Sequence, residues 1–338
     1  GFTKYTPVPG LPQLRSAIVE KFKRDNNLEY TTDQIVVSNG AKQSIANLCM
    51  ALLNEGDEVI LFAPYWVSYI EIVKMAGGVP VELKAGIEDD FKVSAAQLRA
   101  AITTKTKMII FSSPCNPTGS VYLHDELEAI AKVVDAYPQI TIISDEIYEH
   151  INFTEKHVSI GTFKEVKDQT VTVNGMSKGF AMTGWRLGYI GAPKWIAKAC
   201  SKIQGQFTSG ATAFGQMAAA HALNTDLQHT YEMRDAFKRR RDLVISHLRE
   251  IPGIGVNYPQ GAFYIFPDIS SYFGKSYNGN TINDSNDFAM YILNEAHVAI
   301  VAGAAFGANN CIRISYAASD EQLVEAISRI KSACEKLA

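Results

Sequence analysis

The first 175 residues alternate short apolar runs with amphipathic stretches, and this alternation restricts the possible folds more than any other feature of the chain. Apolar runs typical of strands fall at residues 34–38, 58–62, 79–83, 107–112, 140–144 and 170–174. Helical patterns fall at residues 42–53, 66–76, 94–102 and 124–137. Continuous apolar strands joined by helices predict a mostly parallel sheet that is covered by helices on both faces.

The pattern changes after Arg186, where a long helix is predicted at residues 225–250. Shorter strands and two further helices are predicted at residues 262–266, 298–301 and 311–315 and at residues 284–296 and 319–337. A chain of 338 residues is expected to form two domains. We place their boundary inside the long helix, which gives a large domain over residues 1–236 and a smaller α/β domain over residues 237–338.

Charge and cysteine content restrict the partners and the compartment. The net charge of −3 gives no reason to expect a nucleic acid or an anionic membrane as a partner. The basic run at residues 238–241 is interpreted as a solvated helix face. No apolar run approaches the ~18 residues that span a bilayer. Five cysteines without a C-x-x-C pair fit a reducing cytoplasm better than a disulfide scaffold.

Polar and charged residues follow several of the predicted strands. Asp145 comes directly after the strand at residues 140–144, and Tyr148 lies three residues further on. Lys178 lies in a glycine-flanked turn, eight residues before Arg186. Asn116 lies in a Pro-Cys-Asn-Pro-Thr-Gly turn. Because ligands in open α/β sheets bind beyond the carboxyl ends of the strands, we expect these residues to share one site.

Several of these residues also have ordinary structural explanations. Asn116 could be a turn residue, and Asp145 could cap a loop, although a buried carboxylate is costly unless it is paired. The junction at residues 38–42 joins a strand to a helix through a glycine, so free backbone N–H groups and the helix dipole face an anion. That junction alone is weak evidence for a phosphate site, and the planar guanidinium of Arg186 strengthens it.

Together these motifs resemble the fold-type-I, pyridoxal-phosphate-dependent aminotransferases, and most closely the bacterial branch of the aspartate aminotransferases. The resemblance covers nearly the whole chain, and the motifs occur in the order of the family. It implies an α/β fold with a large, mostly parallel, seven-stranded sheet domain and a smaller C-terminal domain. It also implies pyridoxal 5′-phosphate as cofactor and no metal.

The resemblance assigns roles to the residues that face the cofactor ring. Lys178 is expected to form the Schiff base with the cofactor and then to move a proton between Cα and C4′. Asp145 is expected to keep the pyridinium nitrogen protonated. Tyr148 and Asn116 are expected to hydrogen-bond the phenolic oxygen of the cofactor. Trp66, which could also be a core residue, is expected to stack on the ring.

The resemblance also assigns the phosphate contacts. They are expected from Gly40, Ala41, Lys42, Ser177 and Arg186. Tyr5 is expected to reach the phosphate in the neighbouring subunit, which implies an obligate homodimer with shared active sites. One departure is that the position three residues before the lysine, often a phosphate-binding serine in the family, is Gly175.

For the substrate, the resemblance implies that Arg313 binds the α-carboxylate in a bidentate fork, beside Asn116 and Trp66. Lys42 is expected to meet the distal carboxylate, with phosphate binding as the open alternative. Phe263 could add an apolar wall that admits larger substrates. Family members of this branch carry a further N-terminal segment over the active site, which this chain is expected to lack.

The implied reaction transfers the amino group of L-aspartate to 2-oxoglutarate by ping-pong chemistry and gives oxaloacetate and L-glutamate. Three alternatives stay open. The same site could act on prephenate, an aromatic or another amino acid. A C–S lyase would share Lys178, Asp145 and Arg186 with a transaminase. A cofactor-sensing regulator would carry a helix-turn-helix in front of this fold, and none is visible in the sequence.

Overall fold

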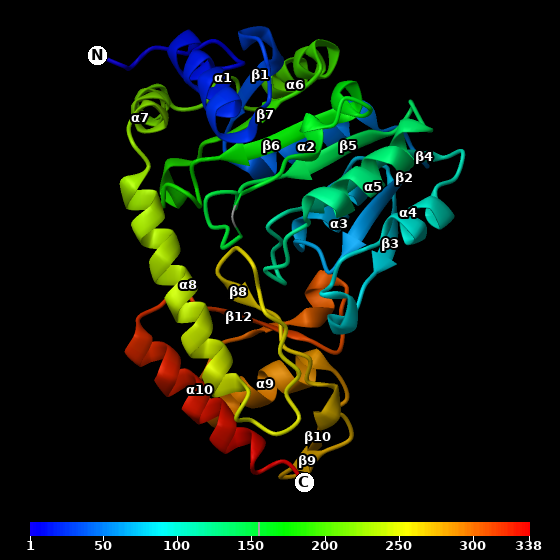
Figure 1. Cartoon of the computed structure of the whole chain (residues 1–338), viewed down its shortest axis with the longest axis vertical. Helices are drawn as coiled ribbons and strands as arrows, with labels where there is room; N and C mark the ends of the chain where they lie inside the picture. The colour runs from blue at the N-terminus through cyan, green and yellow to red at the C-terminus, as the bar shows by residue number, and fades with distance from the viewer. Residues whose placement is uncertain (155) are drawn as a thin grey trace.

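The computed structural model describes residues 1–154 and 156–338 and shows a large sheet flanked by helices above a smaller α/β part (Figure 1). The large sheet has seven strands in the order β1-β7-β6-β5-β4-β2-β3. These strands are β1 (Ile35–Ser38), β2 (Glu58–Ala63), β3 (Val79–Lys84), β4 (Thr106–Ser112), β5 (Thr141–Asp145), β6 (Thr170–Gly175) and β7 (Gly188–Gly191). Within this sheet β7 runs antiparallel to both neighbours, and the other pairs are parallel. The predicted mostly parallel sheet is confirmed.

Helices cover both faces of this sheet. They are α1 (Pro12–Asn26), α2 (Ala41–Leu52), α3 (Ser68–Met75), α4 (Ala95–Ala101), α5 (His124–Asp135), α6 (Lys194–Phe207) and α7 (Ala213–Asn224). Successive residues of β2 point to opposite faces, as the pleat of a strand requires. Val59 and Leu61 pack with α2, α3 and α6, whereas Ile60 and Phe62 pack with α4 and α5. This burial on both faces explains why the strands read as continuous apolar runs.

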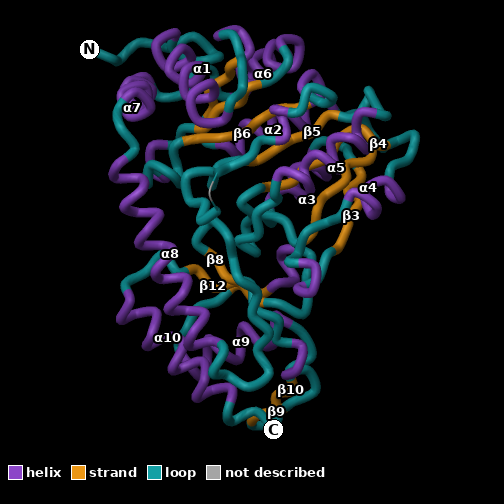
Figure 2. The backbone as a smooth tube through the Cα atoms, viewed as in Figure 1, coloured by secondary structure: helices purple, strands orange, loops and turns teal. Residues whose placement is uncertain are grey.

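The smaller part forms around a second hydrophobic core. It contains α8 (Gln228–Leu248), α9 (Ser285–Ala296), α10 (Asp320–Cys334) and the strands β8 (Tyr264–Ile265), β9 (Ser276–Tyr277), β10 (Asn280–Thr281), β11 (Val301–Ala302) and β12 (Ile312–Ser315). Figure 2 shows its short strands below the large sheet, with loops between the two. Helix α8 runs without interruption from beside the large sheet into this part, and the boundary at residue 236 inside it stays a prediction.

Some elements differ from those that the sequence predicts. The strand at residues 298–301 is wrong for residues 298–300, because α9 ends in a left-handed residue, His297, and pairing with β12 begins only at Val301. The strands β7, β9 and β10 and the helices α6 and α7 were not predicted. The four residues of β7 begin and end with glycine, so they carry little apolar signal. No helix within the described residues is long and apolar enough to cross a membrane.

Candidate active site

A cavity of about 400 Å³ lies at the carboxyl ends of the central strands. Ser112 and Asp145, which end β4 and β5, line it together with residues of the turn that follows β6. Ten residues from the sequence analysis line this cavity: Ala41, Lys42, Trp66, Asn116, Asp145, Tyr148, Ser177, Lys178, Arg186 and Arg313. They come from positions 41 to 313 of the chain, so it is the fold that brings them together.

Three residues of the predicted site are not in the cavity lining. Gly40 precedes α2 and lies behind Ala41. Phe263 adjoins the cavity, since its ring centre is 5.4 Å from the amine nitrogen of Lys178. Tyr5 is 99% exposed, and the fold does not bring it to the cavity of its own chain. Its predicted role toward a neighbouring subunit stays a prediction.

Asp145 is a buried carboxylate with neutral hydrogen-bond donors. Tyr69 donates a hydrogen bond of 2.6 Å to Oδ2, and the backbone N–H of Ile147 donates one of 3.3 Å to Oδ1. Burial raises the pKa of Asp145 to about 6, although the hydrogen bond from Tyr69 opposes this shift. In the described part of the chain Asp145 forms no ion pair. A cation bound in the cavity would therefore stabilise this carboxylate strongly.

Lys178 reaches the cavity from the turn after β6, and its nitrogen lies 5.6 Å from the ring centre of Tyr148. Burial lowers the pKa of this amine, and the nearby guanidinium of Arg313 lowers it further. A larger fraction of the amine is therefore unprotonated near neutral pH than for an exposed lysine. An unprotonated amine is the form that attacks a carbonyl carbon and that accepts a proton.

Two hydrogen bonds orient the residues on the side of the smaller part. The hydroxyl groups of Tyr148 and Tyr264 lie 3.1 Å apart. Arg313, on β12, donates from Nη1 to Oδ1 of Asn116 over 2.9 Å, and its guanidinium carbon lies 4.5 Å from the ring centre of Tyr264. Among the described residues, the buried Nε of Arg313 has no hydrogen-bond partner. An anionic ligand could supply that missing acceptor.

The N-terminus of α2 and Arg186 form an anion-binding corner of the cavity. Arg186 donates from Nη1 to the carbonyl oxygen of Thr183 over 2.9 Å, and it adopts a left-handed backbone with φ of 54°. Gly40 has a φ of 85°, a backbone conformation that favours glycine, and a Cβ atom there would also meet the Arg186 guanidinium. Gly188 is required because a Cβ would collide with the backbone nitrogen of Ala41. Free N–H groups, the helix dipole and a guanidinium together favour a phosphate.

The departure at Gly175 has a steric cause in this backbone. A Cβ atom at this position would lie 2.7 Å from the carbonyl oxygen of Leu187, which is too close for a serine side chain. Ser177, two residues later, lines the cavity instead. Ser177, which follows the end of β6, is therefore the residue of this turn that can offer a hydroxyl donor to a phosphate.

Five residues of the cavity lining were missed from the sequence: Tyr69, Ser112, Ile147, Thr183 and Tyr264. Tyr69 had a weak signal, since it lies three residues after Trp66, and the two rings pack edge to face with centres 5.5 Å apart. Tyr264 directly follows Phe263 in the sequence. Ile147 and Thr183 lie within the sequence motifs around Asp145 and Arg186, and Ser112 ends a predicted strand, but no role was assigned to these three.

The fold and this cavity define a transferase of the pyridoxal-phosphate type. The family model for class I and II aminotransferases matches residues 1–330, and the chain belongs to this family. It is 48% identical over 338 residues to the bifunctional aspartate aminotransferase and glutamate/aspartate-prephenate aminotransferase of Petunia hybrida, covering 98% of this chain and 71% of that protein.

Two bacterial proteins are also similar. The aspartate/prephenate aminotransferase of Cereibacter sphaeroides is 47% identical over 344 residues, which cover 100% of this chain and 85% of that protein. The crystal structure of the aspartate aminotransferase of Rhizobium meliloti superposes with a TM-score of 0.97 at 42% identity, over 100% of this chain and 85% of that chain.

Proposed function

We propose that this aminotransferase takes the amino group of L-aspartate and transfers it to 2-oxoglutarate. The observation that carries this proposal is the placement of Lys42 and Arg313 in one cavity with the Lys178 amine. Arg186 lies beside the helix end that suits a phosphate, so Lys42 and Arg313 are available for the two carboxylates of a substrate. Aspartate, glutamate and their 2-oxo acids all carry two carboxylates.

The position of Lys42 fits the proposed substrate role. Its nitrogen lies 4.9 Å from the ring centre of Trp66, the residue expected to stack on the cofactor ring. A cation held over an aromatic face keeps its charge partly desolvated, which strengthens its attraction to a carboxylate. Arg313 is already oriented by Asn116 and Tyr264, so its planar fork is preorganised for the α-carboxylate.

The residues of the cavity fit pyridoxal phosphate. Lys178 offers an amine for the aldehyde, and Asp145 offers a buried carboxylate that a ring cation would neutralise. The helix end with Arg186 offers an anion site for the phosphate. When bound, the cofactor supplies a ring that accepts the electron pair released from the substrate Cα–H bond.

The protein residues then hold the substrate and move its proton. Arg313 and Lys42 bind the two carboxylates and fix the direction of the Cα–H bond. The Lys178 amine, whose pKa is lowered by burial, would accept the proton from Cα and return it two bonds away, at C4′ of the cofactor. The hydroxyl of Tyr148, which lies 3.1 Å from that of Tyr264, would donate a hydrogen bond to the phenolic oxygen of the cofactor.

We further propose that two copies of the chain form the active enzyme. The helices α6 and α7 each leave a large aromatic side chain exposed, Phe207 and Phe214, and exposed apolar groups of this size favour a partner surface. Arg186 lines a second cavity together with Phe214 and the exposed Trp185. A second copy covering this surface could bring its own Tyr5 to the phosphate corner.

A second candidate substrate is prephenate, a 2-oxo acid with a cyclohexadiene ring, which would accept the amino group. The relatives from Petunia hybrida and Cereibacter sphaeroides are both named for prephenate as well as aspartate. Phe263 adjoins the reacting amine and could contact the ring of such a substrate. The two activities do not exclude each other, because prephenate also carries two carboxylates.

The first experiment is an absorption titration of the protein loaded with pyridoxal phosphate. L-aspartate should convert the long-wavelength band of the bound cofactor to a band at shorter wavelength, and 2-oxoglutarate should restore it. Restoration by prephenate as well would support the second candidate. A bound cofactor that L-aspartate leaves unchanged would contradict the aspartate assignment.

A further inference from the structure

The segment that ends β5 presents its side chains in two opposite directions. Asp145 and Tyr148, three residues apart, line the active-site cavity. Glu146 and Glu149, also three residues apart, are buried on the other side of the same turn. The backbone N–H of Glu149 donates to the carbonyl oxygen of Glu146 over 2.9 Å, which closes the turn. Glu146 and Glu149 therefore lie in the same turn of backbone that orients Asp145 and Tyr148 toward the cavity.

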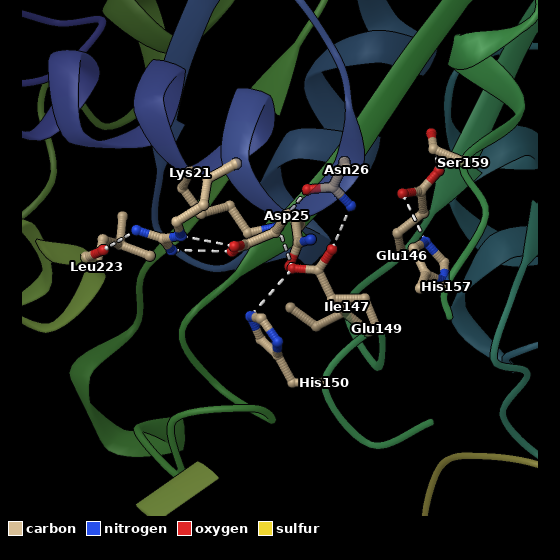
Figure 3. Close-up of polar contacts among 12 residues, drawn as sticks. Lys21, Asp25, Asn26, Glu146, Ile147, Glu149, His150, His157, Ser159 and Leu223 are labelled. Atoms are coloured by element: carbon tan, nitrogen blue, oxygen red, sulfur yellow. Dashed lines mark hydrogen bonds and ion pairs between the residues drawn. The ribbon is translucent and has the colours of Figure 1, made fainter. Parts of the chain in front are cut away.

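The carboxylate of Glu149 is bound by residues of α1 (Figure 3). The ammonium group of Lys21, whose side chain is 0% exposed, forms an ion pair with Glu149. Asn26, at the end of the same helix, donates to Oε2 of Glu149 over 2.5 Å, and Nε2 of His150 lies 3.3 Å from Oε1. Burial alone would raise the pKa of Glu149, but the charge of Lys21 holds it below its ordinary value.

The carboxylate of Glu146 is bound mainly by residues of the loop that follows the turn. Nε2 of His157 lies 2.9 Å from Oε2 of Glu146, as Figure 3 shows. Ser144 and Ser159 donate to Oε1 over 2.9 and 2.6 Å. The backbone N–H of Glu146 also bonds to β6, over 2.9 Å to Val173. Each carboxylate is thus held behind the cavity, Glu149 by an ion pair and a hydrogen bond and Glu146 by His157 and two serine hydroxyls.

A metal site is the other chemistry that this cluster allows. Ligand atoms of Glu146, Glu149 and His157 lie within 4.8 Å of one another. Lys21 already neutralises Glu149, however, and a metal cation beside its ammonium group would be repelled. The contacts favour a network that fixes the turn over a site that binds an ion.

Stability alone does not explain a buried ion pair at this place. Replacing a buried pair with neutral groups of similar volume is often neutral or stabilising, because the desolvation cost of both charges disappears. Active-site side chains, in contrast, must be held within about 0.5 Å by supporting contacts of this kind. The network binds Glu146 and Glu149, which directly follow Asp145 and Tyr148 in the sequence.

We propose that Lys21 and His157 are positioning residues for the cofactor: through Glu149 and Glu146 they fix the turn that aims Asp145 and Tyr148 into the cavity. This inference rests on the proposed function. It assigns to α1, which lies outside the active-site cavity, a role in cofactor binding. Neither residue lines the active-site cavity.

The test uses a variant in which both charges of one pair are removed. Lys21→Met/Glu149→Gln keeps the side-chain lengths, so the apoprotein is expected to unfold at nearly the same temperature as the unchanged chain. Its dissociation constant for pyridoxal phosphate is expected to rise about tenfold or more, and kcat for aspartate to fall more than KM changes. The matched control is Lys132→Met/Glu128→Gln, an exposed pair on α5 with a 3.0 Å contact, which should change none of these.

A second pair of variants keeps the test independent of the first. His157→Gln retains an N–H donor for Glu146, whereas His157→Leu does not, so the glutamine variant should bind the cofactor more tightly than the leucine variant. Variants that fold and bind pyridoxal phosphate as tightly as the unchanged chain, with unchanged kcat, would overturn the proposal. Failure of the unchanged chain to bind the cofactor would instead overturn the proposed function, and the same titration reveals this before any variant is made.

Discussion

Tyr69 donates a 2.6 Å hydrogen bond to Asp145 although 76 residues separate them in the sequence. The tyrosine lies in α3 and the aspartate ends β5, so the bond joins the helix after β2 to the centre of the sheet. Both side chains line the cavity. The bond keeps the carboxylate of Asp145 ionised against the effect of burial, and the cofactor ring nitrogen would need that ionised form.

Tyr69→Phe tests this relationship. Loss of the hydrogen bond should raise the pKa of Asp145 further and weaken the binding of pyridoxal phosphate by about tenfold, the usual effect of one charged hydrogen bond. Equilibrium titration of the apoprotein measures it. Tyr65→Phe, which removes a hydroxyl bonded to Glu82 on β3, is a nearby control, and an equal loss in both variants would contradict the prediction.

Cofactor affinity should also depend on pH through Asp145. Its pKa in the protein without ligand is about 6, so the carboxyl is mostly protonated below that pH and mostly ionised above it. A cationic ring binds to the ionised form, and affinity should therefore fall as the pH falls through 6. The phosphate of the ligand titrates in the same region. The variant Asp145→Asn separates the titration of Asp145 from that of the phosphate. It should bind pyridoxal phosphate weakly, and its affinity should lose the part of the pH dependence that comes from Asp145.

Lys178→Ala should abolish transamination. The variant loses the amine that moves the substrate proton, a step that contributes up to about 10⁴-fold to the rate. Turnover of aspartate with 2-oxoglutarate measures the loss, and the unfolding temperature checks that the fold is intact. Lys74→Ala, at an exposed position on α3, should retain full activity. Substantial turnover by Lys178→Ala would show that another residue is the base.

Lys42→Ala separates the two roles that the sequence left open. If Lys42 binds the distal carboxylate, KM for aspartate should rise about 10- to 100-fold, while KM for an aromatic donor changes little. Steady-state kinetics with both donors measures the difference. Equal losses for both donors, together with weaker cofactor binding, would support the phosphate role instead.

The sequence predicts most of the large sheet because its strands are buried on both faces and carry strong apolar runs. It predicts the residues that carry a motif, such as Lys178 in its glycine-flanked turn. It does not predict Tyr69, because a spacing of three residues from Trp66 is only a weak signal, and the fold alone places the tyrosine hydroxyl 2.6 Å from Asp145. The same holds for Lys21, whose buried pairing with Glu149 joins positions 128 residues apart along the chain.

The left-handed backbone of Arg186 lowers the stability of the folded chain. For a residue with a Cβ atom this conformation costs about 1–2 kcal/mol, a cost that glycine would avoid. The position therefore carries a residue that is worse for folding and better for holding an anion. A phosphate group bound beside Arg186 would offset this cost, because a ligand that binds only the native state stabilises it. A cofactor held there would in this sense be a structural component of the protein as well as a reagent.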